Sequence, residues 1–176
     1  MRLLLSFCAW ISFSLGTASM ALSDNLVSSG AWTYFADTVM GGVSDGAARF
    51  DSTQGAIHLS GTVSTANNGG FIQVRTAISD NAMQAALGIS VTVKGNNETY
   101  YVHLRNRSAR LPWQYYAADF TANSEWQTIK IPFTAFERSS ALMPKSFNPD
   151  TAKSLGLVAF GKDYTADLYV RAIEFY

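Results

Sequence analysis

Cysteine is almost absent from this chain of 176 residues, since Cys8 is the only one. Cys8 lies in an N-terminal apolar run that we expect to be removed, so the mature protein would contain none. Such a protein has no disulfide framework and no thiolate nucleophile. Its stability must come from a packed core, and a chain of about 155 residues can bury about 70% of its unfolded surface as one domain.

An excess of charge of either sign is also absent. Thirteen Lys and Arg residues face thirteen Asp and Glu residues, for a formal net charge of zero. A protein that neutralises nucleic-acid phosphates needs a stripe of basic side chains. The balance of charges therefore argues against nucleic acid as a partner.

Only one long apolar run is present, at residues 3–15. It follows the positive charge of Arg2 and precedes the small residues of segment 16–21 (GTASMA). This order is typical of a secretory signal peptide, and the run is short for a membrane span. We expect residues 1–21 to be a cleaved signal peptide and residues 22–176 to be the mature domain, secreted or periplasmic, with no membrane span after cleavage. An uncleaved membrane anchor is the alternative.

Histidine is scarce too, with only His58 and His103 in the chain. Each lies alone in a segment with alternating apolar residues. A metal site needs several ligands at close spacing, so the sequence predicts neither a metal site nor a cofactor.

Short apolar stretches separated by turn residues fill the rest of the chain. Segment 88–94 alternates most clearly, because Ile89, Val91 and Val93 point one way and the residues between them the other. Similar patterns predict further strands at 32–35, 47–51, 56–61, 71–76, 99–105, 114–120, 126–133, 155–161 and 167–176. About ten strands at this spacing favour an all-β antiparallel sandwich or barrel.

The connections carry expectations of their own. The turn residues at 94–97 predict that segments 88–94 and 99–105 form an antiparallel hairpin. Segments 80–87 and 150–154 are expected to form one or two helical turns each, and segment 137–149 a surface loop.

Two glycine-rich strings distinguish the sequence: DTVMGGVSDG at 37–46 and NNGGF at 67–71. Glycine and asparagine tolerate left-handed backbone conformations, which explains only part of each string. The remaining polar and apolar members are candidate binding residues: Asp37, Thr38, Met40, Ser44, Asn67 and Asn68. The alternative is structural, since Asp37 and Asn68 can satisfy backbone donors in tight turns.

Segment 42–46 also matches G-x-S-x-G, the nucleophile elbow of hydrolases, with Ser44 as nucleophile. An elbow needs a buried strand before the serine and a helix after it. The residues around Ser44 show neither pattern, so a serine esterase is a remote alternative.

Strand alternation places further polar residues together. Gln73 and Arg75 share one face of their strand, and Tyr101, His103 and Arg105 share one face of theirs. Trp113 and Tyr115 follow closely, so we add Gln73, Arg75, Arg105, Trp113 and Tyr115 to the candidate binding residues. A polar face edged by aromatic rings suits a glycan or a peptide, and an ordinary solvated face is the alternative. Arg75 or Arg105 can instead cap loop carbonyls.

Together these strings resemble the complex I intermediate-associated protein 30 family. The resemblance begins at Trp32 and includes both glycine-rich strings. It continues through segments 56–61, 88–94 and 100–105, then Tyr115, Trp126 and segments 131–133 and 173–176. It implies a galactose-binding-like jelly roll without catalytic activity.

Mitochondrial members of that family are chaperone-like assembly factors of NADH:ubiquinone oxidoreductase. The apparent signal peptide sets this chain apart from them. The resemblance therefore implies a module that binds an unidentified protein partner in a chaperone-like or accessory role outside the cytoplasm. A carbohydrate-binding module with a glycan partner is the alternative.

Overall fold

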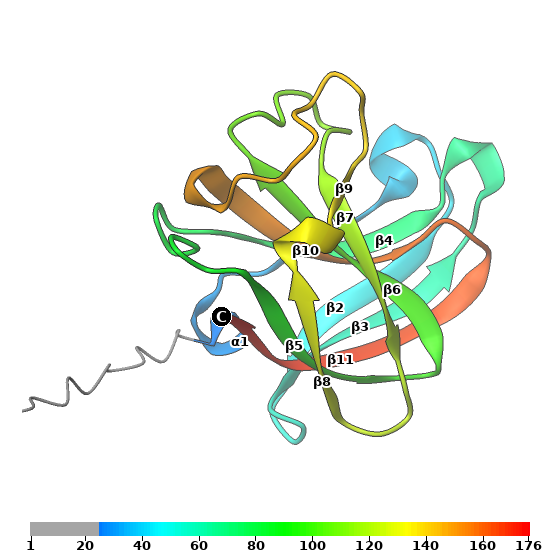
Figure 1. Cartoon of the computed structure of the whole chain (residues 1–176). Helices are drawn as coiled ribbons and strands as arrows, with labels where there is room; N and C mark the ends of the chain where they lie inside the picture. Colours follow the sequence, from blue (N-terminus) through cyan, green and yellow to red (C-terminus); the bar gives the residue numbers. More distant parts are fainter. Residues whose placement is uncertain (1–24) are drawn as a thin grey trace, which may run out of the picture.

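The computed structural model describes residues 25–176, so the expected signal peptide lies outside the described residues. Two antiparallel sheets pack face to face (Figure 1). In spatial order, sheet A contains β1 (Thr33–Ala36), β4 (Phe71–Ala77), β10 (Ala152–Phe160), β6 (Glu98–Asn106), β7 (Tyr116–Ala122) and β9 (Glu137–Arg138). Sheet B contains β2 (Asp45–Asp51), β3 (Ala56–Val63), β11 (Tyr164–Phe175), β5 (Gly88–Gly95) and β8 (Gln127–Pro132).

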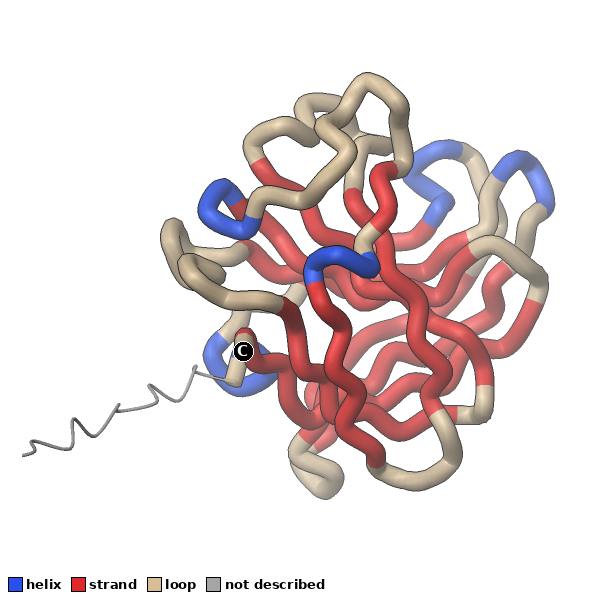
Figure 2. Tube along the Cα trace, in the orientation of Figure 1, coloured by secondary structure: helices blue, strands red, loops and turns tan. Residues whose placement is uncertain are grey.

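This arrangement confirms the predicted all-β antiparallel sandwich. Each of the ten expected strands is present. In the part of the chain that the structure describes, the sequence missed only the two-residue strand β9, which opens the segment expected to be a loop. Among residues 25–176, helical structure is limited to the short α1 (Leu26–Ser29) and four 3₁₀ turns, η1 (Asp37–Met40), η2 (Ala66–Asn68), η3 (Phe133–Ala135) and η4 (Pro149–Thr151) (Figure 2). None of the helices between residues 25 and 176 has the length and apolar character that a bilayer crossing needs.

The core lies between the sheets and follows the alternation of the strands. In sheet A, Ile72 and Val74 of β4 and Val102 and Leu104 of β6 point inward and are buried. Their partners from sheet B are equally buried, and they include Leu59, Ile89, Val91, Val93, Leu168 and Ile173. The opposite side of sheet A is therefore the side that carries the predicted polar residues.

The predicted hairpin between segments 88–94 and 99–105 is wrong. β5 pairs with β8 and β11 in sheet B, whereas β6 pairs with β7 and β10 in sheet A. The turn residues do reverse the chain, but the chain passes there from sheet B to sheet A. Each of the two strands buries one apolar face. The alternation of apolar residues is the same for two strands paired in one sheet and for two strands in facing sheets, so it could not distinguish these arrangements.

Segment 80–87 forms successive hydrogen-bonded turns instead of a helix. Asn81 and Ala85 have left-handed φ values of 65° and 63°, which interrupt helical geometry. Met83 between them is fully buried. In segment 150–154, η4 gives way at Ala152 to β10, so only its first residues are helical.

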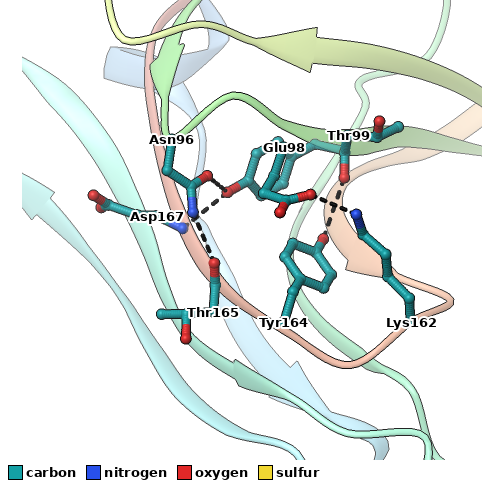
Figure 3. Close-up of polar contacts among 8 residues, drawn as sticks. Asn96, Glu98, Thr99, Lys162, Tyr164, Thr165 and Asp167 are labelled. Carbon is teal, nitrogen blue, oxygen red and sulfur yellow. Dashed lines mark hydrogen bonds and ion pairs between the residues drawn. The ribbon is translucent and has the colours of Figure 1, made fainter.

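The crossing from β5 to β6 is fixed by a group of polar contacts to β11 (Figure 3). The Asn96 side chain donates to the carbonyl of Thr165 at 2.8 Å and accepts from the Tyr100 hydroxyl at 2.6 Å. That hydroxyl also accepts from the backbone N–H of Asp167 at 2.8 Å. One buried tyrosine thus joins the start of β6 to β11.

Removal of the Tyr100 hydroxyl should therefore weaken the fold. Tyr100→Phe leaves the N–H of Asp167 and the Asn96 side chain without this partner, and we expect a loss of about 1–3 kcal/mol in the free energy of unfolding. Urea denaturation measures it. Tyr34→Phe is the matched control, because the Tyr34 hydroxyl is buried without a hydrogen-bond partner among the described residues and its removal should cost less. Equal losses would contradict this role of Tyr100.

Candidate binding face

The two glycine-rich strings meet at the carboxylate of Asp37, which is fully buried at the start of η1. Oδ1 accepts from the backbone N–H of Ser44 at 3.0 Å. Oδ2 accepts from the Ser44 hydroxyl at 2.5 Å and from the N–H groups of Gly70 and Phe71 at 2.5 Å and 3.2 Å. One side chain therefore holds the first string closed and attaches it to the second.

The glycines make room for this carboxylate. A Cβ atom on Gly42 or on Gly69 would collide with the Asp37 side chain. Gly41 ends η1 with a left-handed φ of 90°, and Gly70 has a φ of 127° beside its bond to Asp37. A larger residue at these positions would block the carboxylate or strain the backbone.

The protonation state of Asp37 follows from the same contacts. Burial raises the pKa of the carboxyl, but the hydrogen bonds from Gly70, Ser44 and Phe71 outweigh it and hold the pKa below its ordinary value. The folded protein therefore contains Asp37 as a charged acceptor.

The other residues of the strings divide between exposed and buried positions. Thr38, Met40, Asn67 and Asn68 are exposed, and both asparagines adopt left-handed φ values near 60°. Ser44 and Asp37 are buried, so they can influence a ligand only through the shape of the loops. A binding role for each stays a prediction.

The surroundings of Ser44 differ from those of a nucleophile elbow. A 3₁₀ turn leads directly into the segment, where an elbow has a strand, and β2 follows it, where an elbow has a helix. The Ser44 hydroxyl also accepts from the N–H of Ser64 at 3.0 Å, and neither histidine is among its partners. His58 bonds to Asp167 at 2.7 Å instead.

The outer face of sheet A gathers the predicted strand residues. In register, Gln73 of β4 lies opposite Val158 of β10, which lies opposite Tyr101 of β6. One row further on, Gly156 lies between Arg75 and His103. The predicted shared face is therefore correct, and β10 separates its two halves.

Gly156 shapes the middle of this face. A Cβ there would collide with the side-chain amide of Gln73, which lies across the space that the glycine leaves. The amide is thereby placed between Arg75 and the aromatic residues of β6.

Aromatic rings cover the rest of the face. His103 stacks on Tyr115 with centroids 3.9 Å apart, and Tyr101 meets Phe160 edge to face at 5.8 Å. Phe35 and Phe71 form a second edge-to-face pair at 6.2 Å beyond β10. We call Tyr101, Tyr115, Phe160, Phe35 and Phe71 the aromatic platform.

Phe35, Phe71 and Phe160 were missed by the sequence-based prediction. Alternation places Phe71 on the face of Gln73 and Arg75, so its position was available from the sequence. Phe35 and Phe160 join only through the pairing of β1 and β10 with β4.

The histidine of this face is uncharged. Burial lowers the pKa of His103 to about 3, and its Nε2 has no hydrogen-bond partner among the described residues. The ring therefore contributes an uncharged flat surface on which Tyr115 stacks. Within residues 25–176, no three His, Cys, Asp or Glu side chains gather as a metal site would need.

Arg105 is fixed by the loop before β7. Its Nη2 donates to the carbonyls of Ala109 and Leu111 at 3.0 Å and 2.9 Å, as the alternative of a carbonyl-capping arginine anticipated. Trp113 lies on the same loop and is 63% exposed. Its carbonyl accepts from the hydroxyl of Ser139 at 2.9 Å, which ties this loop to the segment after β9.

The sequence of residues 21–168 matches the family described as Complex I intermediate-associated protein 30 (CIA30). The chain belongs to the CIA30 family. The glycine-rich strings that meet at Asp37 and the whole aromatic platform lie inside the matched region. No curated protein sequence matches the chain.

Solved structures resemble the CIA30 domain in fold. A family 11 carbohydrate-binding module of the cellulosomal cellulase Lic26A-Cel5E of Clostridium thermocellum is 18% identical, with a TM-score of 0.65 over 82% of this chain and 86% of that one. The family 11 module from the same organism in complex with a β-1,3-1,4-mixed-linked tetrasaccharide is 17% identical, with a TM-score of 0.67 over 92% of both chains.

A family 30 carbohydrate-binding module of the C. thermocellum cellulase Cel9D-Cel44B is similar as well, at 14% identity and a TM-score of 0.55 over 84% of this chain and 90% of that one. At such low identities the likeness concerns the fold. The CIA30 domain is thus a jelly-roll β-sandwich, as the resemblance implied.

Loss of the Asp37 carboxylate should destabilise the CIA30 domain strongly. Asp37→Ala leaves the buried N–H groups of Ser44 and Gly70 without an acceptor, and we expect a loss on the order of 3 kcal/mol or more in chemical denaturation.

The isosteric variant Asp37→Asn tests the charge. Because the folded pKa lies below that of the unfolded chain, the carboxylate stabilises the fold above about pH 4 and ceases to do so as the pH falls through its folded pKa. The stability difference between wild type and Asp37→Asn should therefore shrink in acid. A difference that stays constant with pH would contradict a charged Asp37.

Proposed function

We propose that this CIA30 domain is a non-catalytic module that binds a glycan on the outer face of sheet A. The observation that carries the proposal is the aromatic platform with polar groups set among its rings. Gln73 lies at its centre and Arg75 beside Phe35, with the guanidinium 4.8 Å from the ring centroid.

This arrangement suits the two surfaces of a sugar ring. The C–H groups of a sugar pack against aromatic rings, and its hydroxyls need donors and acceptors placed at the edges of those rings. Tyr101 and Tyr115 are half-buried, so part of each ring faces outward. Phe160 is 38% exposed between the two halves of the face.

The similar solved structures support the same proposal. They are described as carbohydrate-binding modules, and one was solved with a mixed-linked tetrasaccharide. The family match supports a binding module without catalytic activity. With the expected signal peptide, we place the glycan outside the cytoplasm, in a secreted or periplasmic setting.

A second candidate function rests on the loop that Asp37 anchors. Val39, Met40 and Val43 are 71%, 66% and 50% exposed, which presents three apolar side chains on a closed loop. Apolar residues held in this way suit a protein partner. They support the chaperone-like or accessory role that the family resemblance implies.

The glycan proposal predicts that loss of platform rings weakens binding without unfolding the domain. Tyr101→Ala and Phe160→Ala should each reduce the affinity for a bound oligosaccharide by about tenfold, since one ring contact contributes on the order of 1 kcal/mol or more. Titration calorimetry with mixed-linked glucan, galactan and xylan oligosaccharides and with oligogalacturonides would measure this.

Tyr169→Ala is the matched control, because Tyr169 is a half-buried tyrosine on sheet B, stacked on His58 at 4.0 Å. It should leave affinity unchanged. Binding that survives both platform variants, or that fails with every oligosaccharide, would exclude the platform as a glycan site.

The second candidate predicts that polar substitutions in the anchored loop abolish capture of a protein partner. The triple variant Val39→Ser, Met40→Ser and Val43→Ser should keep its melting temperature, because the three side chains are mainly exposed. Pull-down from the native compartment, compared with Phe50→Ser as an exposed apolar control on β2, would test it. Equal recovery of partners by both variants would exclude the loop.

A further inference from the structure

The aromatic platform continues into a depression at one end of the outer face of sheet A. It has a volume of about 640 Å³ and is formed by β1, β4, the start of β10, the end of β6 and the loop after it. Its polar lining consists of Thr33, Arg75, Arg105, Arg107, Lys153 and Ser154, with the buried Thr76 and Asn106 behind them.

The charges of this depression are unbalanced, although the whole chain is neutral. Four of the lining residues are basic and none is acidic. Asp80 is the acid that contacts them, at 2.8 Å from Lys153 and 4.0 Å from Arg107. Within residues 25–176, Arg75 and Arg105 have no acidic partner.

The guanidinium of Arg105 is preorganised for an anion. The carbonyls of Ala109 and Leu111 hold its Nη2, so the guanidinium is fixed before any ligand arrives. Its Nε is buried without a hydrogen-bond partner among the described residues. These carbonyls take both N–H groups of Nη2, so the two N–H groups of Nη1 remain as donors for an anionic oxygen.

Arg75 places a second positive charge beside the first. Its guanidinium lies over the ring of Phe35, and its charge adds to burial in lowering the pKa of Arg105. Two adjacent guanidinium groups repel each other, and a bound anion would relieve this repulsion. Arg75 also flanks the space at Gly156 that holds the Gln73 amide, so the depression adjoins the platform directly.

We propose that this depression binds the carboxylate or sulfate group of an acidic polysaccharide, whose neighbouring sugar rings lie on the aromatic platform. The inference rests on the proposed glycan-binding function and names its substrate class. Arg75 and Arg105 contact the anionic oxygens, Lys153 adds charge at the edge, and the hydroxyls of Thr33 and Ser154 bond to the sugar.

The experiment measures affinities of the mature protein by titration calorimetry at low and moderate salt. The probes are an oligogalacturonide for the carboxylate, a sulfated galactan oligosaccharide for the sulfate, and a neutral galactan oligosaccharide. We expect at least one acidic probe to bind about tenfold or more tightly than the neutral one, and its affinity to fall as salt rises. The acidic probe that binds more tightly identifies the anionic group.

Arg75→Gln and Lys153→Gln test the location of the anion. Each should reduce affinity for the acidic probe, Arg75→Gln by about tenfold. Lys153 lies outside the aromatic platform, so Lys153→Gln should leave affinity for the neutral probe within about twofold, whereas Arg75→Gln should weaken binding of the neutral probe less than binding of the acidic one. Arg49→Gln makes the same change of charge at an exposed position on β2 of sheet B and should have no effect. Melting temperatures of all three variants confirm that they are folded.

The outcomes separate the two proposals. Equal affinity for acidic and neutral probes, with loss in Tyr101→Ala, would overturn the acidic specificity and keep the glycan-binding function. Acidic binding that Arg75→Gln leaves unchanged, or that Arg49→Gln weakens equally, would overturn the depression as its site. Failure of every oligosaccharide would overturn both proposals, and tight binding of inorganic sulfate alone would overturn the polysaccharide as the ligand.

Discussion

The buried carboxylate of Asp37 is the interaction on which this end of the sandwich depends. It accepts hydrogen bonds from two segments that are about 30 residues apart in sequence, and so joins the entry to β2 with the entry to β4. Its net contribution is favourable only because four donors replace the water that burial removes. The glycines of both strings are a consequence, since any side chain on Gly42 or Gly69 would occupy the space of the carboxylate.

The same anchor sets the position of the candidate binding face. Phe71 donates its N–H to Asp37 and begins β4, the strand that carries Gln73 and Arg75 outward. From there the pairing of β4 with β10 and of β10 with β6 brings the remaining rings and Arg105 alongside. The loop that carries Val39, Met40 and Val43 also depends on the anchor. Asp37 closes this loop, and the closed loop keeps the three apolar side chains exposed to solvent. One buried group thus supports two surfaces with different chemistry.

Alternation made much of the fold and part of the face predictable. Each expected strand exists, and the outward placement of Gln73, Arg75, Tyr101, His103 and Arg105 followed from a period of two along each strand. The hairpin failed because the apolar pattern of β5 and β6 is the same for partners within a sheet and across a core. The prediction of helical turns in segment 80–87 failed because Asn81 and Ala85 adopt left-handed conformations. Asparagine often does so, but nothing in the sequence indicated a left-handed alanine. Phe35 and Phe160 were missed because their strands join the face only through pairing.

The sequence by itself determined the strands, their buried and exposed sides, the family and the identity of the unusual loops, because these depend on local periodicity and on short runs of particular residues. Only the tertiary structure decided that both glycine-rich strings serve one carboxylate, since hydrogen bonds between distant segments leave no local pattern. The tertiary structure also decided that Arg75 and Arg105, which have no acidic partner among the described residues, lie together at one end of sheet A although the chain as a whole is neutral. Net charge is a sum over the whole chain, whereas the charge that a ligand meets depends on which strands the fold brings together.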